Sequence, residues 1–149
     1  MKLRHVGIVI SKETFDETIE FYKMFGFVFS HGKVESGEYI NNFFHMNGLK
    51  ILTWKMKNEF DDCIELIRLE NDTPYSGQMG NGLRHIGITH IAIQVKNLRE
   101  TEKKLIKSGV SLVCDIQYIP AGTRSACEVL FCRDPNGVFI ELVEEKEEK

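Results

Sequence analysis

The sequence predicts an α+β protein in which one order of elements, a strand, a helix and further strands, occurs twice. A short motif is repeated near the start of each half, as LRHVGI at residues 3–8 and LRHIGI at residues 83–88. Segments rich in β-branched residues also alternate with two segments of helical periodicity. The chain has 149 residues, which is enough for one sizeable core or for two small modules that share one.

Seven segments are short and rich in β-branched residues, a composition that favours strands. They are residues 5–10, 51–54, 63–69, 90–95, 110–113, 128–132 and 138–144.

A first helix is predicted after the first strand. Thr14 and Glu17 have the spacing of a capping box, and Phe15, Ile19 and Tyr22 form one apolar stripe at helical spacing.

A second helix is predicted after the strand at residues 90–95. Asn97 is its expected N-cap, and Glu100 follows three residues later. Leu98, Thr101 and Leu105 lie along one side.

The two halves form one predicted domain, 1–149, with its boundary near residue 80. Residues 1–70 make the first module and 85–144 the second. Residues 71–84 contain a proline and several glycines and are interpreted as a linker. Residues 145–149 are interpreted as a charged tail.

Composition excludes several classes of function. Charged residues make up 28% of the chain and the net charge is −3, so nucleic acid is a poor candidate partner. No apolar run reaches the length of a membrane span, and we expect a cytoplasmic protein. The four cysteines form no CxxC pair, which favours free thiols over a zinc site or disulfides.

Each half has a histidine in its first strand and a glutamate in its last. These are His5 and Glu65, then His90 and Glu141, and both glutamates lie within the sequence IEL. A carboxylate in an apolar strand is costly to bury unless it is paired or metal-bound. One such residue is usually structural, but four at repeated positions favour a shared role.

His90 is preferred to His85 as the counterpart of His5. His5 lies six residues before the first possible cap, Ser11, and His90 lies seven before Asn97, whereas His85 lies twelve before it. Strand alternation places His5 and His90 on the less apolar face of each strand, which leaves the Ile/Val face for the helices. His85 is left as a candidate for substrate binding.

Several runs resemble the vicinal oxygen chelate superfamily, which includes glyoxalase I, methylmalonyl-CoA epimerase, extradiol dioxygenases and bleomycin or fosfomycin resistance proteins. They are HVGIVI, FYKMFGF, HIAIQV and, above all, RDPNGVFIELVE at residues 133–144. The resemblance implies two βαβββ modules that form a cupped eight-stranded mixed sheet around a metal site, with helices on the outer face.

The resemblance also implies one divalent metal per chain, Ni²⁺, Co²⁺, Zn²⁺, Mn²⁺ or Fe²⁺, with His5, Glu65, His90 and Glu141 at the four ligand positions. Four-ligand members resemble glyoxalase I and the epimerase, in which the metal stabilises an enediolate or enolate. This favours a lyase, isomerase or epimerase acting on a small oxygenated acid or thioester. Glu141, and secondarily Glu65, are then the candidate catalytic bases.

Two other classes of function remain open. An extradiol-type dioxygenase would use His5, His90 and Glu141 as ligands and act on a catechol. A non-catalytic binding or resistance protein would bind a small molecule without turnover.

Four further residues are candidates for contact with an anionic or aromatic substrate: Arg124, Tyr118, Trp54 and Arg84. We also expect a homodimer, because superfamily members often dimerise and a βαβββ module has exposed sheet edges.

Overall fold

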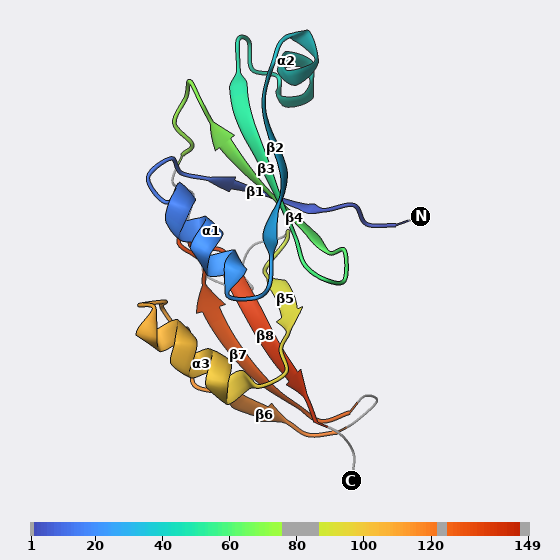
Figure 1. The fold of residues 1–149 in the computed structure, drawn as a ribbon, viewed down its shortest axis with the longest axis vertical. Coiled ribbons are helices and arrows are strands. Elements are labelled where there is room, and N and C mark those ends of the chain that lie inside the picture. The colour runs from blue at the N-terminus through green and yellow to red at the C-terminus, as the bar shows by residue number, and fades with distance from the viewer. Residues whose placement is uncertain (1, 76–86, 122–124, 147–149) are drawn as a thin grey trace. The chain divides into compact units, whose positions relative to one another are not determined.

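The computed structural model describes residues 2–75, 87–121 and 125–146. The chain divides into two compact units, Met1–Ser76 and Gly77–Lys149. Each unit contains its own four-stranded mixed sheet (Figure 1). The predicted α+β class, with one arrangement of elements used twice, is therefore confirmed.

The first unit has the sheet order β1-β4-β3-β2, with β1 parallel to β4 and the other pairs antiparallel. Its elements are β1 (Val6–Ile10), α1 (Phe15–Lys23), β2 (Val28–Ser36), α2 (Glu38–Phe44), β3 (Lys50–Lys57) and β4 (Cys63–Leu69).

The second unit repeats this topology with the order β5-β8-β7-β6, and β5 is parallel to β8. Its elements are β5 (Ile91–Gln94), α3 (Leu98–Lys107), β6 (Gln117–Ile119), β7 (Cys127–Arg133) and β8 (Phe139–Glu145).

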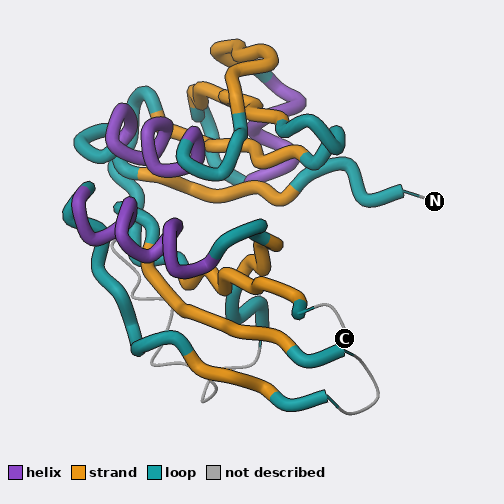
Figure 2. The backbone as a smooth tube through the Cα atoms, turned by 60° about the horizontal axis from the view of Figure 1, so that its bottom comes forward, coloured by secondary structure: helices purple, strands orange, loops and turns teal. Residues whose placement is uncertain are grey.

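Each unit buries an apolar layer between one face of its sheet and one helix. In Figure 2, α1 and α3 each run alongside the strands of their own unit. The buried side chains of the first layer include Ile8, Ile10, Phe21, Tyr22, Met56, Ile64 and Leu66. Those of the second include Leu98, Leu105, Leu130, Cys132, Ile140 and Leu142. The Ile/Val face is thus the inner face, as strand alternation predicts.

The start of α3 was predicted correctly. The Asn97 side chain accepts a hydrogen bond from the backbone N–H of Glu100 at 2.9 Å. Glu144 of β8 adds a second cap, because its Oε2 accepts a hydrogen bond from the Leu98 N–H at 2.6 Å. These bonds satisfy donors that the first turn of a helix cannot satisfy itself.

The capping box predicted for α1 is wrong. Thr14 is the N-cap but makes no side-chain capping hydrogen bond. Instead, the Oγ of Ser11 accepts a hydrogen bond from the Thr14 backbone N–H at 3.2 Å. Ser11, the first possible cap in the sequence, therefore supplies the side-chain acceptor in this turn.

The strand predicted at residues 110–113 is also wrong. This segment makes an isolated bridge between Leu112 and Cys132, and the Val113 N–H donates to the Phe131 carbonyl at 2.8 Å. The edge strand is β6, at Gln117–Ile119. The apolar content of residues 110–113 predicted a strand there. In the structure, the strand that pairs with β7 on this side is Gln117–Ile119.

Two elements of the first unit were not predicted, β2 and α2. Almost every residue of β2 is exposed, because it is the edge strand, and so it lacks an apolar pattern. The short α2 begins after Gly37, whose φ of 103° favours glycine, and packs Ile40 against Leu49 and Ile51. The longer first half of the sequence therefore contains an additional helix as well as loops.

None of the helices in the described ranges is long and apolar enough to span a membrane.

Candidate metal centre

Glu65 and His5 form a close pair in the first unit. Glu65 of β4 lies opposite Gly7 in the parallel β1–β4 register, and His5 precedes Gly7 by two positions, so all three share one face of the sheet. Nε2 of His5 lies 3.1 Å from Oε2 of Glu65. We call His5 and Glu65 the first half-site.

His90 and Glu141 form the same arrangement in the second unit. Glu141 of β8 lies opposite Ala92 in the parallel β5–β8 register, and His90 again precedes that residue by two positions. Nε2 of His90 lies 3.0 Å from Oε2 of Glu141. We call this pair the second half-site. In the strand register, His90 has the same position as His5. His85 falls outside the described residues.

Both half-sites lie on the sheet face opposite the apolar layer. The neighbours of Glu65 in its strand, Ile64 and Leu66, are fully buried in that layer. The side chain of Glu65 is 12% exposed and that of Glu141 is 20% exposed, while the two histidines are about one-third exposed. Each carboxylate is therefore largely removed from water and needs a polar partner.

The donor chemistry of the half-sites fits a divalent metal. Two ligands at neighbouring octahedral positions, each about 2.1 Å from a metal, lie roughly 3.0 Å apart. The His–Glu separations of 3.1 and 3.0 Å have this value, which also suits a hydrogen bond. Within the described ranges, no group of three or more His, Cys, Asp or Glu side chains could hold a metal. Each half-site thus supplies two donors.

The two half-sites differ in the residue on the neighbouring antiparallel strand. In the first unit, Lys55 of β3 lies opposite Glu65, and its Nζ is 3.1 Å from Oε1 of that carboxylate. In the second unit, Phe131 of β7 lies opposite Glu141. The Phe131 ring meets the His90 ring edge-on, with centroids 5.5 Å apart.

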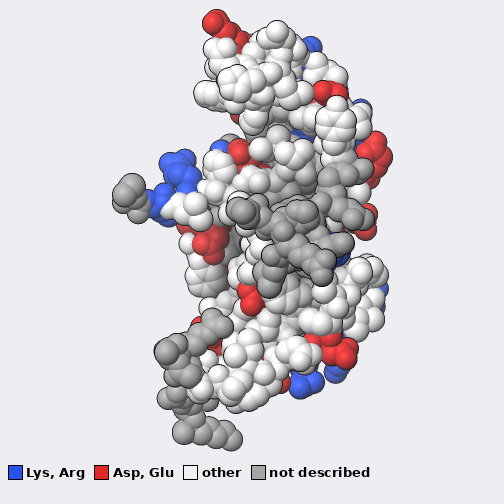
Figure 3. All heavy atoms as spheres, turned by 180° about the vertical axis from the view of Figure 1, so that it is seen from behind, with Lys and Arg blue, Asp and Glu red and all other residues white. Residues whose placement is uncertain are grey.

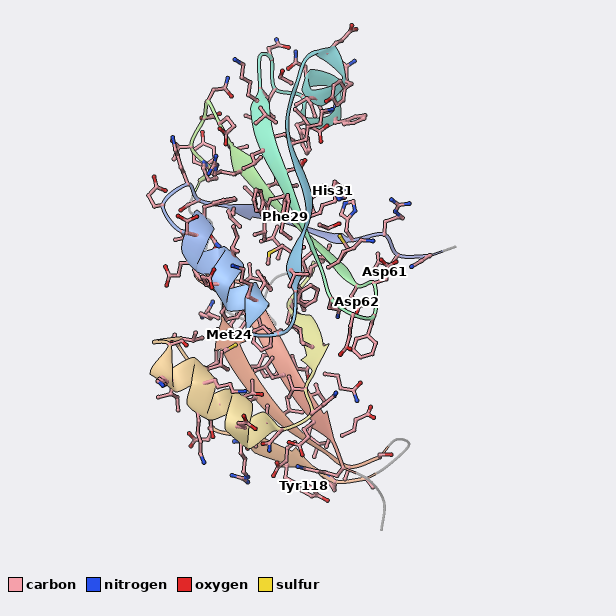
Figure 4. The ribbon with its side chains drawn as sticks, in the orientation of Figure 1. Met24, Phe29, His31, Asp61, Asp62 and Tyr118 are labelled. Atoms are coloured by element: carbon pink, nitrogen blue, oxygen red, sulfur yellow. The ribbon has the colours of Figure 1, made fainter. Side chains whose placement is uncertain are left out.

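Lys55 and Phe131 were not identified from the sequence. The available signal was a lysine within the strand LTWKMK, at the alternation position that faces away from the apolar layer. The same row continues to His31 of β2, which lies opposite Lys55 and is labelled in Figure 4. Only the pairing of the strands places Lys55 beside Glu65 and Phe131 beside Glu141.

Trp54 lies on the other face of the first sheet, because it is adjacent to Lys55 in the strand and lies opposite Leu66. Its ring contacts Phe15 of α1 and Phe29 of β2, with centroids 5.5 and 4.1 Å apart. Its indole nitrogen is buried and has no hydrogen-bond partner in the described ranges. The structure therefore does not bring Trp54 together with the first half-site.

Tyr118 is likewise separate from the second half-site. It lies on the edge strand β6, is 63% exposed, and lies opposite Glu128 (Figure 4). Glu128 in turn lies opposite Glu144, on the sheet face that does not carry Glu141. The other two candidates for substrate contact, Arg84 and Arg124, fall outside the described residues.

Glu144, near the end of β8, and Lys146, just after it, form an ion pair on the side of the sheet that faces α3. The Leu98 N–H, and then Lys146, lower the pKa of Glu144. Hydrogen bonds to Glu144 and Glu128 raise the pKa of Lys146. Acidic and basic side chains are interspersed on the face drawn in Figure 3.

All four cysteines are free thiols in the structure. Burial raises the pKa of Cys132 to about 12, so this thiol stays protonated at neutral pH. Burial also raises the pKa of the Cys63 thiol.

Comparison with known proteins identifies the family. Residues 2–142 match the family described as the Glyoxalase/Bleomycin resistance protein/Dioxygenase superfamily. The chain belongs to this superfamily. No curated protein matches the sequence.

Solved structures of this superfamily share the fold of the chain. A glyoxalase family protein from Bacillus cereus is 20% identical, with a TM-score of 0.84, and the match covers 99% of this chain and 95% of that one. A glyoxalase family protein from Enterococcus faecalis is 16% identical, with a TM-score of 0.65 and coverage of 96% and 97%.

A fosfomycin resistance protein, FosX from Listeria monocytogenes, is also similar. It is 13% identical with a TM-score of 0.58, and the match covers 95% of this chain and 87% of that one. That structure, of a single-residue mutant, holds Mn(II) and 1S,2S-dihydroxypropylphosphonic acid. At these identities the likeness concerns the fold alone.

Proposed function

We propose that this superfamily member is a metal-dependent lyase, isomerase or epimerase that moves a proton on a small oxygenated acid or thioester. The observation that carries the proposal is the repeated His–Glu pair, at the same register position in each unit. Two imidazoles and two carboxylates together make a four-donor set for one divalent ion.

In this proposal His5, Glu65, His90 and Glu141 hold the metal. When bound, the ion acts as a Lewis acid that stabilises negative charge developing on two adjacent substrate oxygens. Each histidine presents Nε2 to the carboxylate of its own glutamate.

Glu141 is the proposed general base. It accepts the proton from the substrate carbon and returns a proton to the product, so the carboxylate is regenerated in each cycle. Its side-chain partner in the described ranges is His90, whose Nε2 lies 3.0 Å from Oε2 of Glu141. Glu65 is held by both His5 and Lys55, and so has less freedom to move toward a substrate.

The test detects proton transfer directly. Metal-stripped protein is reconstituted with Ni²⁺, Co²⁺, Zn²⁺, Mn²⁺ or Fe²⁺ singly; Mn²⁺ is included because the similar FosX structure holds it. Small α-hydroxy acids, 2-oxo acids and acyl thioesters are then incubated in D₂O, and deuterium next to the carbonyl group is measured by NMR. Metal-dependent deuterium incorporation that Glu141→Gln abolishes supports the proposal.

Other outcomes distinguish the alternatives. Oxygen consumption with catechols would identify a dioxygenase. Stoichiometric binding of a ligand without exchange or turnover would identify a binding or resistance protein. Either result would replace the proposed reaction.

A further inference from the structure

We infer that Lys55 controls metal binding at the first half-site by holding the Glu65 carboxylate, and that the second half-site is the stronger metal-anchoring pair. The inference rests on the proposed function, because it assigns a positioning residue to the proposed metal site. It makes the two halves of the repeat unequal in their affinity for the ion.

The contacts of Glu65 support the role of Lys55. One carboxylate oxygen lies 3.1 Å from Nε2 of His5, and the other lies 3.1 Å from Nζ of Lys55. The Lys55 side chain is 23% exposed, so this ion pair is only partly screened by water. Lys55 therefore offsets the cost of holding a carboxylate away from solvent, and it fixes the direction in which Glu65 points.

The second half-site has an aromatic ring in place of this cation. Phe131 lies opposite Glu141, and its ring packs edge-on against His90. In the described ranges, no lysine or arginine forms an ion pair with Glu141. Phe131 therefore restricts the His90 ring and adds no positive charge.

The charges of the two half-sites follow from these contacts. With neutral imidazoles, Glu65 and Lys55 cancel, whereas Glu141 leaves the second half-site with one negative charge. A divalent ion is attracted to the second and must compete with an ammonium group at the first. Lys55 thus lowers the metal affinity of the first half-site while it stabilises the metal-free state.

Replacement of Lys55 tests its predicted effect on metal affinity. Lys55→Met should tighten metal binding by about tenfold, measured by calorimetry with Mn²⁺ and Zn²⁺ at low ionic strength. Metal addition should also raise its melting temperature more than that of wild type, because the unpaired Glu65 carboxylate regains a cation. Lys55→Arg, which keeps the charge, should retain the wild-type affinity.

Lys57→Met is the matched control. Lys57 is on the same strand and the same face as Lys55, but its ion pair is with Asp61, in the turn between β3 and β4 (Figure 4). This variant loses an equal charge without changing the contacts of Glu65. Its metal affinity should stay within about twofold of wild type.

The reciprocal substitution gives the second unit a lysine at the position that Lys55 has in the first. Phe131→Lys places a lysine opposite Glu141, and it should weaken metal binding by about tenfold. Circular dichroism establishes that each variant is folded. If Lys55→Met does not fold, Lys55→Gln removes the same charge and keeps a polar side chain.

The outcomes distinguish this inference from the proposed function. Unchanged or weaker binding by Lys55→Met, while wild type binds metal, would overturn the role of Lys55 and leave the metal site in place. If neither wild type nor any folded variant binds a divalent metal, both ideas are wrong. If Lys55→Met and Lys57→Met both bind metal more tightly, the effect arises from the net charge of the protein alone. That result would also overturn the inference.

Discussion

Nε2 of His90 lies 3.0 Å from Oε2 of Glu141, and the first unit repeats this relationship between its own histidine and glutamate at 3.1 Å. A side-chain pair at the same register position in two copies of one topology is difficult to attribute to packing alone. The most direct prediction from these pairs is that the chain binds a metal ion.

We predict about one divalent ion per chain, measured by elemental analysis after reconstitution. Binding should stabilise the folded state by about 3 kcal/mol when free metal is about 100-fold above Kd, provided that the ion binds only the folded chain. Affinity should fall in acid, because imidazole binds metals only in its neutral form. An unchanged melting temperature in Ni²⁺, Co²⁺, Zn²⁺ and Mn²⁺ would refute the prediction.

The two histidines near the start of the second half, His85 and His90, should differ in their effect on metal content. We expect His90→Ala to lose most of the bound metal, because His90 lies beside Glu141. His85→Ala should keep wild-type content and serves as the matched control. If His85→Ala removes the metal and His90→Ala does not, the LRHIGI segment, and not residues 90–95, corresponds to the first strand in function.

Glu141→Gln should reduce the rate of the proton-transfer reaction by about 10²–10⁴-fold, the usual effect of losing a general base. Glutamine keeps the shape of the side chain, and its oxygen can still approach a metal. Glu65→Gln should be milder, because Glu65 is not the proposed base and a glutamine oxygen can still bind a metal. Steady-state rates at saturating metal test both variants; a larger loss for Glu65→Gln would exchange the two roles.

The contact between Glu144 and the start of α3 predicts a dependence of stability on pH. The Leu98 N–H lowers the pKa of Glu144 in the folded state. The contact therefore stabilises the fold above the pKa of an unfolded glutamate, about 4.3, and this contribution is lost as pH falls through the lower folded-state value.

Glu144→Gln should lower the free energy of unfolding at pH 7 by about 1 kcal/mol, as for loss of a helix cap, and by less near pH 3. Urea denaturation at both pH values measures this. Glu145→Gln, at an exposed position of the same strand, is the control and should change stability by less than about 0.5 kcal/mol. An equal loss in both variants would contradict a specific cap.

We predict a homodimer at micromolar concentration, measured by light scattering. Each sheet has two edge strands, and β2 is nine residues long and almost wholly exposed. Mixing His5→Ala with His90→Ala chains also tests where the site forms. Recovery of metal binding on mixing indicates a site built across two chains, whereas no recovery indicates a site within one chain. A monomer at that concentration would contradict the predicted assembly.

The repeat and the segments rich in β-branched residues were sufficient to predict the fold class and most of its strands. β4 has the predicted bounds, and β1, β5, β7 and β8 differ by at most one residue at each end. These strands are buried on one face, so their apolar residues carry a clear pattern. The edge strand β2 and the short helix α2 are mostly exposed and carry none.

The candidate ligands could also be found by comparing the two halves. The histidine at the start and the glutamate at the end of each half lie far apart in sequence, yet a parallel pairing of first and last strands brings them together. Their function as ligands stays a prediction.

The sequence by itself determined that two similar modules each place a histidine and a glutamate on the face away from the core, because strand alternation is a local property. The tertiary structure alone decided what lies beside each glutamate. Antiparallel pairing places Lys55 opposite Glu65 and Phe131 opposite Glu141. Register depends on how whole strands pack. As a result, Lys55 neutralises the charge of Glu65 in the first half-site, whereas Glu141 in the second has Phe131 in that position.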